Sequence, residues 1–189
     1  MISNIASGET GRLLAEEARK LSAEVTLLLG PVGELKTEKG IRILRFNYFS
    51  ELYSLIRKEL SGKKYDAVIH SAAVSDYQPK ISFKHKIKSG AKVLGLELSP
   101  TLRIVDKIKK ISPATFLVAF KLEFGLTKNK LIAEARQLLK RSRADLVVAN
   151  TFDKNRYRAY IFNGEVIKGP LLNKRNLAKK LIHDLGESL

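Results

Sequence analysis

The chain has 189 residues, 44% of them hydrophobic, and a formal net charge of +16, which together predict one globular domain over 1–189 with a buried core. It has no cysteine, which excludes disulfides and thiolate sites; it has neither an apolar run of ~18–20 residues nor a signal-peptide pattern, so we expect a cytoplasmic protein. The basic residues are spread along the chain with few aromatic residues beside them, which favours an anionic small substrate over nucleic acid.

The first predicted element is a glycine-rich turn, 4–11, that leads into a helix with Leu14 and Ala18 on one face. A helix N-terminus after such a turn presents free backbone N–H groups and a positive dipole end, which bind phosphate or carboxylate. Ser7 and Thr10 are also ordinary capping residues, so the turn by itself leaves a purely structural role open.

Short apolar runs then alternate with helical patterns along the chain. Strands are expected over 24–29, 41–46, 66–71, 93–98, 115–120 and 145–149. Helices are expected after a cap at Asn47 as far as residue 62, and over 101–111, 127–142 and 173–185. A hairpin is expected over 158–167, because Asn163-Gly164 is a preferred two-residue turn. The pattern is typical of a doubly wound α/β fold, a Rossmann-like and mostly parallel sheet with helices on both faces.

A basic loop separates the strands expected at 66–71 and 93–98. It is interrupted by Pro79 and Gly90 and carries Lys80, Lys84, Lys86, Lys88 and Lys92. The loop has neither a helical nor a strand period, so we expect a mobile segment that suits a polyphosphate. A solvated loop without a ligand is the alternative, because most lysines are exposed.

Polar and glycine residues gather where this fold places ligands, at the carboxyl ends of strands or at a helix start. They lie at 4–11, 70–77, 120–123 and 150. Taken in order with the lysine loop, five segments form one pattern: Ile2–Gly11, Ala72–Tyr77, Lys86–Lys88, Phe120–Glu123 and Ala144–Asn150. This pattern resembles the phosphopantothenoylcysteine synthetase family, the ligase domain of the DNA/pantothenate metabolism flavoprotein.

The resemblance implies a phosphopantothenate–cysteine ligase of coenzyme A biosynthesis. Its substrates would be 4'-phosphopantothenate, cysteine and a nucleoside triphosphate, ATP or CTP, with Mg2+ as cofactor, and it would be a homodimer. Asn4 matches the asparagine that handles the acyl-nucleotidylate, and Lys86 matches a lysine that contacts the nucleotide phosphates, so these two are the catalytic candidates. The nucleotide-binding candidates are Ser7, Gly8, Gly11, Ala72, Ala73, Asp76, Lys86, Phe120 and Asn150. The metal ligands are left open.

The chain also departs from the family pattern. The family has a strand and a Gly-Gly-Thr loop before the asparagine turn, and neither precedes Asn4, so we expect exposed sheet edges and an uncertain activity. Leu138 and Ser142 stand where bacterial members place lysines against CTP, which favours ATP. Two alternatives stay open: a nucleotide-binding member without catalysis, and an NAD(P)-dependent oxidoreductase, which the lack of a Gly-x-Gly-x-x-Gly motif after a first strand disfavours.

Overall fold

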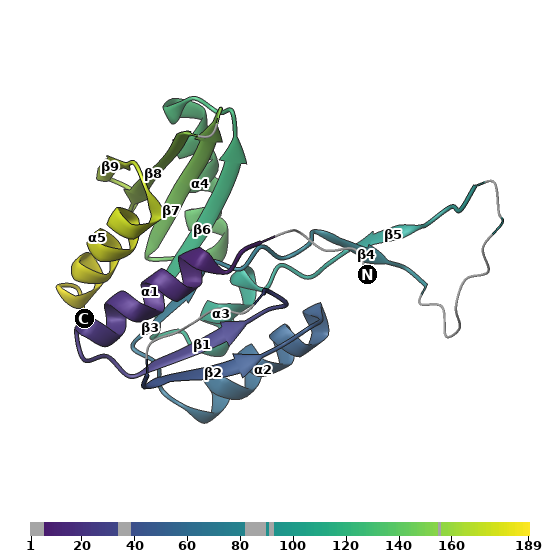
Figure 1. Cartoon of the computed structure of the whole chain (residues 1–189), viewed down its shortest axis with the longest axis horizontal. Helices are drawn as coiled ribbons and strands as arrows, with labels where there is room; N and C mark the ends of the chain where they lie inside the picture. Colours follow the sequence, from purple (N-terminus) through teal and green to yellow (C-terminus); the bar gives the residue numbers. More distant parts are fainter. Residues whose placement is uncertain (1–5, 34–38, 82–89, 91–92, 155) are drawn as a thin grey trace.

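A computed structural model describes residues 6–33, 39–81, 90, 93–154 and 156–189 (Figure 1). The helices in these ranges are α1 (Glu9–Lys20), α2 (Phe49–Gly62), α3 (Val105–Ile111), α4 (Lys128–Ser142) and α5 (Lys174–Gly186). The strands are β1 (Val25–Leu29), β2 (Ile41–Arg45), β3 (Ala67–His70), β4 (Tyr77–Pro79), β5 (Leu98–Pro100), β6 (Phe116–Phe124), β7 (Leu146–Asp153), β8 (Arg156–Phe162) and β9 (Ile167–Leu171).

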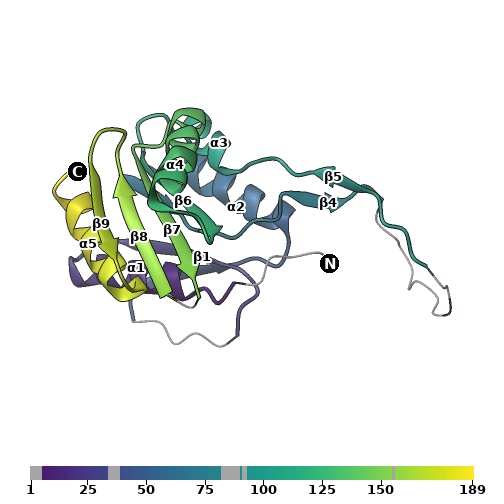
Figure 2. The same ribbon diagram turned by 90° about the horizontal axis from the view of Figure 1, so that it is seen from above.

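The main sheet has five strands in the order β3-β6-β7-β8-β9. Strands β3, β6 and β7 are parallel, and β8 and β9 are antiparallel to their neighbours. Strands β1 and β2 form a separate parallel pair, and β4 and β5 form an antiparallel pair that projects from the body as an arm (Figures 1 and 2). The expected doubly wound α/β fold is confirmed, and β8 and β9 are the hairpin predicted around Asn163-Gly164.

Two apolar clusters cover opposite faces of the main sheet, because successive side chains of a strand point to opposite faces. On one face, Leu131 and Leu138 of α4 pack with Leu117 and Val147 of the sheet. On the other face, α1 and α5 pack over Val118 and Val148, and the chain brings in Leu13, Leu14, Leu177 and Leu181. Figure 2 shows α4 and α5 on opposite sides of the sheet. Helices α1 and α5 therefore cover the face of the sheet opposite α4.

Three sequence-based expectations are wrong. The strand expected over 93–98 is confined to β5, which pairs in the arm with β4 and not in the main sheet. Val93, Leu94 and Leu96, whose apolar character suggested a buried strand, are exposed. The helix expected from residue 101 begins only at Val105. Asn47 does not cap α2: the helix is capped at Tyr48, and the Glu51 carboxylate accepts a hydrogen bond from the Asn47 backbone N–H at 2.7 Å.

Strands β6 and β7 are longer than the sequence predicts. The apolar runs end at Phe120 and Ala149, but pairing continues to Phe124↔Phe152 between β6 and β7 and to Asp153↔Arg156 between β7 and β8. Backbone hydrogen bonds to a neighbouring strand hold these polar extensions in the sheet, which composition does not reveal. Phe120 and Asn150 therefore lie within strands and not beyond their ends. Among the described helices, none is long and apolar enough to cross a membrane.

Candidate functional site

The glycine-rich turn lies at the N-terminus of α1, as predicted. Gly8 precedes the helix with φ of 70°, a left-handed conformation that favours glycine. The Ser7 hydroxyl accepts a hydrogen bond from the Glu9 backbone N–H at 3.4 Å. A methyl group placed on Gly11 would lie 3.7 Å from both Leu27 of β1 and the hydroxyl of Ser71, which directly follows β3. The turn is thereby fixed beside the carboxyl end of β3.

Phe120 of β6 and Asn150 of β7 lie on the same face of the sheet, the one that α1 and α5 cover. Phe120 packs into the cluster that contains Leu13 and Leu14 of α1. Asn150 is two residues beyond Val148, which belongs to that cluster, so its side chain points to the same face. Phe120 and Asn150 thus lie on the face of the sheet that α1 covers, and Ser7, Gly8 and Gly11 lie at the N-terminal end of that helix.

Ala72, Ala73 and Asp76 form the connection from β3 to the arm. All three are exposed. The connection is fixed by Thr101, whose hydroxyl donates to the Ser75 carbonyl at 2.5 Å and whose backbone N–H donates to the Asp76 carbonyl at 2.8 Å. Ala72 and Ala73 follow Ser71 and so begin beside Gly11, whereas Asp76 lies at the base of the arm. The two catalytic candidates, Asn4 and Lys86, lie outside the described residues.

Three other residues named in the sequence analysis or within its segments, Lys121, Leu138 and Ser142, lie away from this face. Lys121 is paired with Glu123 at 2.7 Å and with Glu134 of α4 at 3.4 Å. Burial acts to lower the pKa of Lys121, but the hydrogen bonds and charges of Glu123 and Glu134 together outweigh burial, so the pKa is raised. Leu138 of α4 is buried against the sheet, on the face opposite α1. Ser142 is also buried, with its hydroxyl bonded to the Leu138 carbonyl at 2.7 Å. The preference for ATP over CTP stays a prediction.

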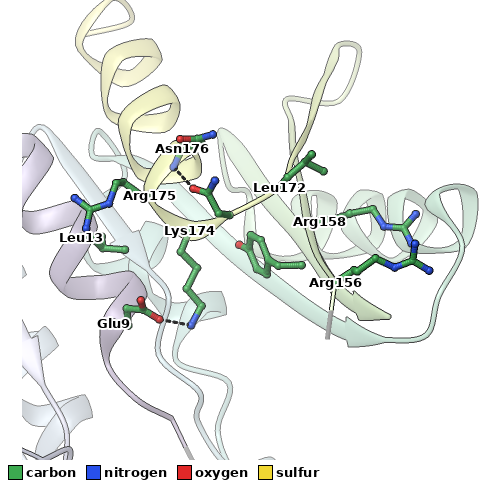
Figure 3. Close-up of a pocket in the computed structure, with 10 residues that line it drawn as sticks. Glu9, Leu13, Arg156, Arg158, Leu172, Lys174, Arg175 and Asn176 are labelled. Carbon is green, nitrogen blue, oxygen red and sulfur yellow. Dashed lines mark hydrogen bonds and ion pairs between the residues drawn. The ribbon is translucent and has the colours of Figure 1, made fainter. Parts of the chain in front are cut away.

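An open cavity of about 910 Å³, which was not predicted from the sequence, adjoins the N-terminus of α1 (Figure 3). Three segments line it: the start of α1, the start of β8 and the N-terminus of α5. The lining residues are Glu9, Leu13, Arg156, Tyr157, Arg158, Leu172, Asn173, Lys174, Arg175 and Asn176. Lys174 contacts Glu9 at 2.7 Å, which ties α5 to the glycine turn. The available sequence signal was Asn173, a helix cap followed by two basic residues.

Charge and burial shape this cavity. The hydrogen bond from Lys174 lowers the pKa of Glu9, with further lowering by Arg12 and Arg175, against the opposing effect of burial. Burial raises the pKa of the Tyr157 hydroxyl, and the neighbouring Asn150 side chain partly offsets this. The two side chains are not close enough or well enough aligned to form a hydrogen bond. Among the described residues, the Tyr157 hydroxyl and the Asn150 amide oxygen are both buried without a partner. Asn150 nonetheless lies next to Tyr157, one of the residues that line the cavity.

One cluster of possible metal ligands occurs among the described residues, His183, Asp184 and Glu187 in the last turns of α5. Asp184 is already bound by Lys168 at 3.0 Å and Lys180 at 2.7 Å. The cluster also lies at the end of α5 away from the glycine turn. It therefore does not fit a metal that acts on a nucleotide held at α1.

Comparison with known proteins agrees with this geometry. Residues 1–188 match the model of the DNA/pantothenate metabolism flavoprotein C-terminal domain family. The coenzyme A biosynthesis bifunctional protein CoaBC of Thermococcus kodakarensis is 38% identical over 197 residues, which cover 100% of this chain and 47% of that protein. The chain thus spans about half the length of the curated relatives it matches.

Solved structures give the same grouping. The DNA/pantothenate metabolism flavoprotein of Streptococcus pneumoniae superposes with a TM-score of 0.88 at 24% identity, over 100% of this chain and 91% of that one. The C-terminal domain of a CoaBC protein superposes with a TM-score of 0.78 at 27% identity, over 99% of this chain and 85% of that one. The chain therefore belongs to the DNA/pantothenate metabolism flavoprotein C-terminal domain family, as its resemblance to the phosphopantothenoylcysteine synthetases predicted.

Proposed function

We propose that this chain is a phosphopantothenate–cysteine ligase of coenzyme A biosynthesis. Its membership of the family over residues 1–188 supports this activity, as does the likeness to a bifunctional protein of coenzyme A biosynthesis. The structural observation that carries the proposal is the packing of the start of α1 against Leu27 of β1 and against Ser71 at the carboxyl end of β3. In an open α/β sheet this is the place where phosphate-bearing ligands bind.

The reaction has two steps. The carboxylate of 4'-phosphopantothenate attacks the α-phosphorus of a nucleoside triphosphate, forming an acyl-nucleotidylate and releasing pyrophosphate. The cysteine amine then attacks the acyl carbon, so that an amide forms, the bond to the nucleotide oxygen breaks, and the nucleoside monophosphate and one proton are released. Both steps place negative charge on oxygen atoms, which positioned N–H groups and lysines stabilise.

The residues divide this work. The free N–H groups at the start of α1, after Gly8, would bind phosphate oxygens, and Phe120 and Asn150 would form the nucleotide pocket beneath them. Lys86 would neutralise charge at the α-phosphate, and the Asn4 amide would hold the acyl carbonyl as it becomes tetrahedral. Ala72 and Ala73 would allow close approach at the end of β3. Each of these roles follows from the position of the residue in the family pattern.

Mg2+ would reduce repulsion between the triphosphate and the attacking carboxylate. The ion is usually held by one or two carboxylates together with substrate phosphates. Asp76 fits this requirement, because its carboxylate is exposed and no ion pair occupies it among the described residues. Glu9 fits less well, since Lys174 contacts its carboxylate at 2.7 Å.

The arm supports the further proposal of a homodimer. Its apolar side chains are exposed in a single chain: Tyr77, Ile81, Val93, Leu94, Leu96 and Leu98. A surface of this kind on a projecting hairpin is typical of a protein interface. A second copy of the chain would cover it and would bring another arm close to the first site.

The test is a measurement of pyrophosphate release with purified protein, ATP or CTP, and Mg2+. We expect release only when 4'-phosphopantothenate is present, and amide formation only when cysteine is added. Comparison of kcat/KM for the two nucleotides decides the preference. Nucleotide binding without pyrophosphate release would refute the ligase proposal in favour of a non-catalytic member, and binding of NAD(P)H would favour an oxidoreductase.

A further inference from the structure

The cavity between α1, β8 and α5 is strongly basic. Arg156, Arg158, Lys174 and Arg175 line it, against a single lining carboxylate, that of Glu9. Lys174 contacts Glu9, and Arg158 contacts Asp153 at 3.0 Å. Arg175 makes no hydrogen bond or close ion pair within the described part of the chain, although its charge acts on Glu9. The cavity therefore holds more positive charge than its own carboxylates neutralise (Figure 3).

The N-terminus of α5 adds backbone donors to these charges. The Asn173 side chain caps the helix by accepting a hydrogen bond from the Asn176 backbone N–H at 2.7 Å. The backbone N–H groups of Lys174 and Arg175, at the first two helical positions, have no acceptor among the described residues. These groups carry the positive end of the dipole of a 13-residue helix.

An independent observation comes from Tyr157, in another element that lines the cavity. Its side chain is 9% exposed and its buried hydroxyl has no hydrogen-bond partner within the described residues. A buried hydroxyl without a partner costs about 1–3 kcal/mol, so such groups usually have a ligand or an ion to bind. The hydroxyl is therefore an unsatisfied donor just beneath the lining of a basic cavity, beside the Asn150 side chain.

We propose that this cavity binds a phosphate group of a small molecule, held by Lys174, Arg175 and the N-terminus of α5, with the Tyr157 hydroxyl as a further donor. A phosphate fits because it offers several charged acceptor oxygens to donors that converge from two elements. The site does not depend on the ligase reaction, because it is defined by its own charges and donors.

The ion pair between Glu9 and Lys174 makes this site responsive to nucleotide binding. Glu9 occupies the first position of α1, directly after Gly8, and its carboxylate competes with a phosphate for Lys174. A bound phosphate releases Glu9 from Lys174 and so changes the charge at the start of α1. Occupation of the cavity consequently alters the affinity of the glycine turn for its own ligand, and the reverse holds by linkage.

The experiment is a calorimetric titration of inorganic pyrophosphate into the whole chain and its variants at fixed ionic strength. Arg175→Gln should weaken binding roughly tenfold, the effect of one charged hydrogen bond. Glu9→Gln should tighten binding, because it removes the competing carboxylate. Tyr157→Phe should weaken binding by several-fold. Lys179→Gln, an exposed position further along α5, is the matched control and should leave the affinity unchanged.

Equal loss of affinity in Arg175→Gln and Lys179→Gln would overturn the proposal, since it would mean general attraction by the net charge of +16. Absence of pyrophosphate binding to the wild-type chain would overturn it as well. A second arm repeats the titration with a non-hydrolysable ATP analogue already bound. Competition would identify the bound group as a phosphate of the nucleotide, and simultaneous binding would identify a separate anion; either result supports the site. Failure of the ligase assay would not alter these titrations.

Discussion

Gly11 of α1 and Ser71 at the end of β3 face each other so closely that a methyl group on Gly11 would lie 3.7 Å from the Ser71 hydroxyl. This is ordinary van der Waals contact, so the space above the strand accepts a methyl group but little more. A ligand that approaches the helix start between these residues therefore competes with any added side chain.

We predict that Gly11→Ala makes the protein more stable but weakens its use of the nucleotide. Alanine should raise the free energy of unfolding by about 0.5–1 kcal/mol, because glycine is a poor helix former. The same methyl group should raise KM for the nucleotide. Gly62→Ala is the control, because Gly62 is the last residue of α2 and no atom lies within 4 Å of an added methyl group there. It should leave KM unchanged, and an unchanged KM in Gly11→Ala would remove the helix start from the nucleotide site.

Asn150→Ala should reduce activity with little effect on stability. The Asn150 amide oxygen is buried without a partner, so its removal breaks no hydrogen bond there and should change the free energy of unfolding by less than about 1 kcal/mol. If the amide binds nucleotide, kcat/KM should fall by roughly tenfold or more. Asn163→Ala is the opposite control: it loses bonds to the Glu165 and Val166 backbone N–H groups, so it should lower stability alone.

Lys86→Gln should lower kcat by roughly 10²–10³-fold, the usual effect of removing one group that stabilises developing charge. Circular dichroism and the melting temperature should stay the same, because glutamine keeps most of the length of the lysine side chain and removes only its charge. Lys80→Gln, in the arm where Lys80 pairs with Glu97 at 2.7 Å, is the control for general loss of basic charge. A normal rate in Lys86→Gln would exclude this lysine from the chemistry.

His70 should make stability depend on pH between about 4 and 6.5. Burial lowers its pKa from 6.5 to about 4, with Asp106 opposing. The unfolded chain therefore binds a proton in this range that the native chain does not, so stability is full above pH 6.5 and falls as the pH drops toward 4. We expect a loss of about 1–2 kcal/mol over this range after allowance for partial solvation. Urea unfolding at several pH values should show a flatter dependence of stability on pH for His70→Gln than for the wild type, and an equally steep dependence would exclude His70 as its cause.

The double variant Leu94→Lys, Leu96→Lys should convert a dimer into a monomer. Both side chains are exposed on the arm, at 53% and 49%, so charge there should not disturb the core. Light scattering after size-exclusion chromatography would measure the mass. Val166→Lys, at an exposed position of the β8–β9 turn, is the control. If the double variant and wild type have the same mass, the arm does not form the interface.

The amino-acid sequence predicts most of the fold, because periodic apolar residues report which face of a helix or strand is buried. Leu131 and Leu138 identify the inner face of α4 in this way. The pattern fails at the arm, where Leu94 and Leu96 have the character of a core strand but are exposed in the single chain. An apolar run in the sequence does not show whether its side chains are buried within the same chain, and here they are not.

The candidate site is predictable only where local sequence carries the signal. Gly8 and Gly11 could be placed because a glycine turn before a helix is recognisable. The ion pair between Glu9 and Lys174 joins residues 165 positions apart, and no local pattern indicates it. Such long-range pairs depend on the way α1 and α5 pack together, which is decided by tertiary contacts.

The separate β1–β2 pair has a consequence for partial unfolding. In the described chain no backbone ladder joins β1 to β3; instead the Tyr65 hydroxyl lies 3.3 Å from the Thr26 hydroxyl and donates to Glu59 at 2.6 Å. Arg42 of β2 and then Tyr65 lower the pKa of Glu59 to about 2. The β1–β2 pair is thus held to its neighbours by side-chain hydrogen bonds around the Glu59 carboxylate. Its amide hydrogens should exchange with deuterium well before those of β6 and β7, and faster still once acid protonates Glu59.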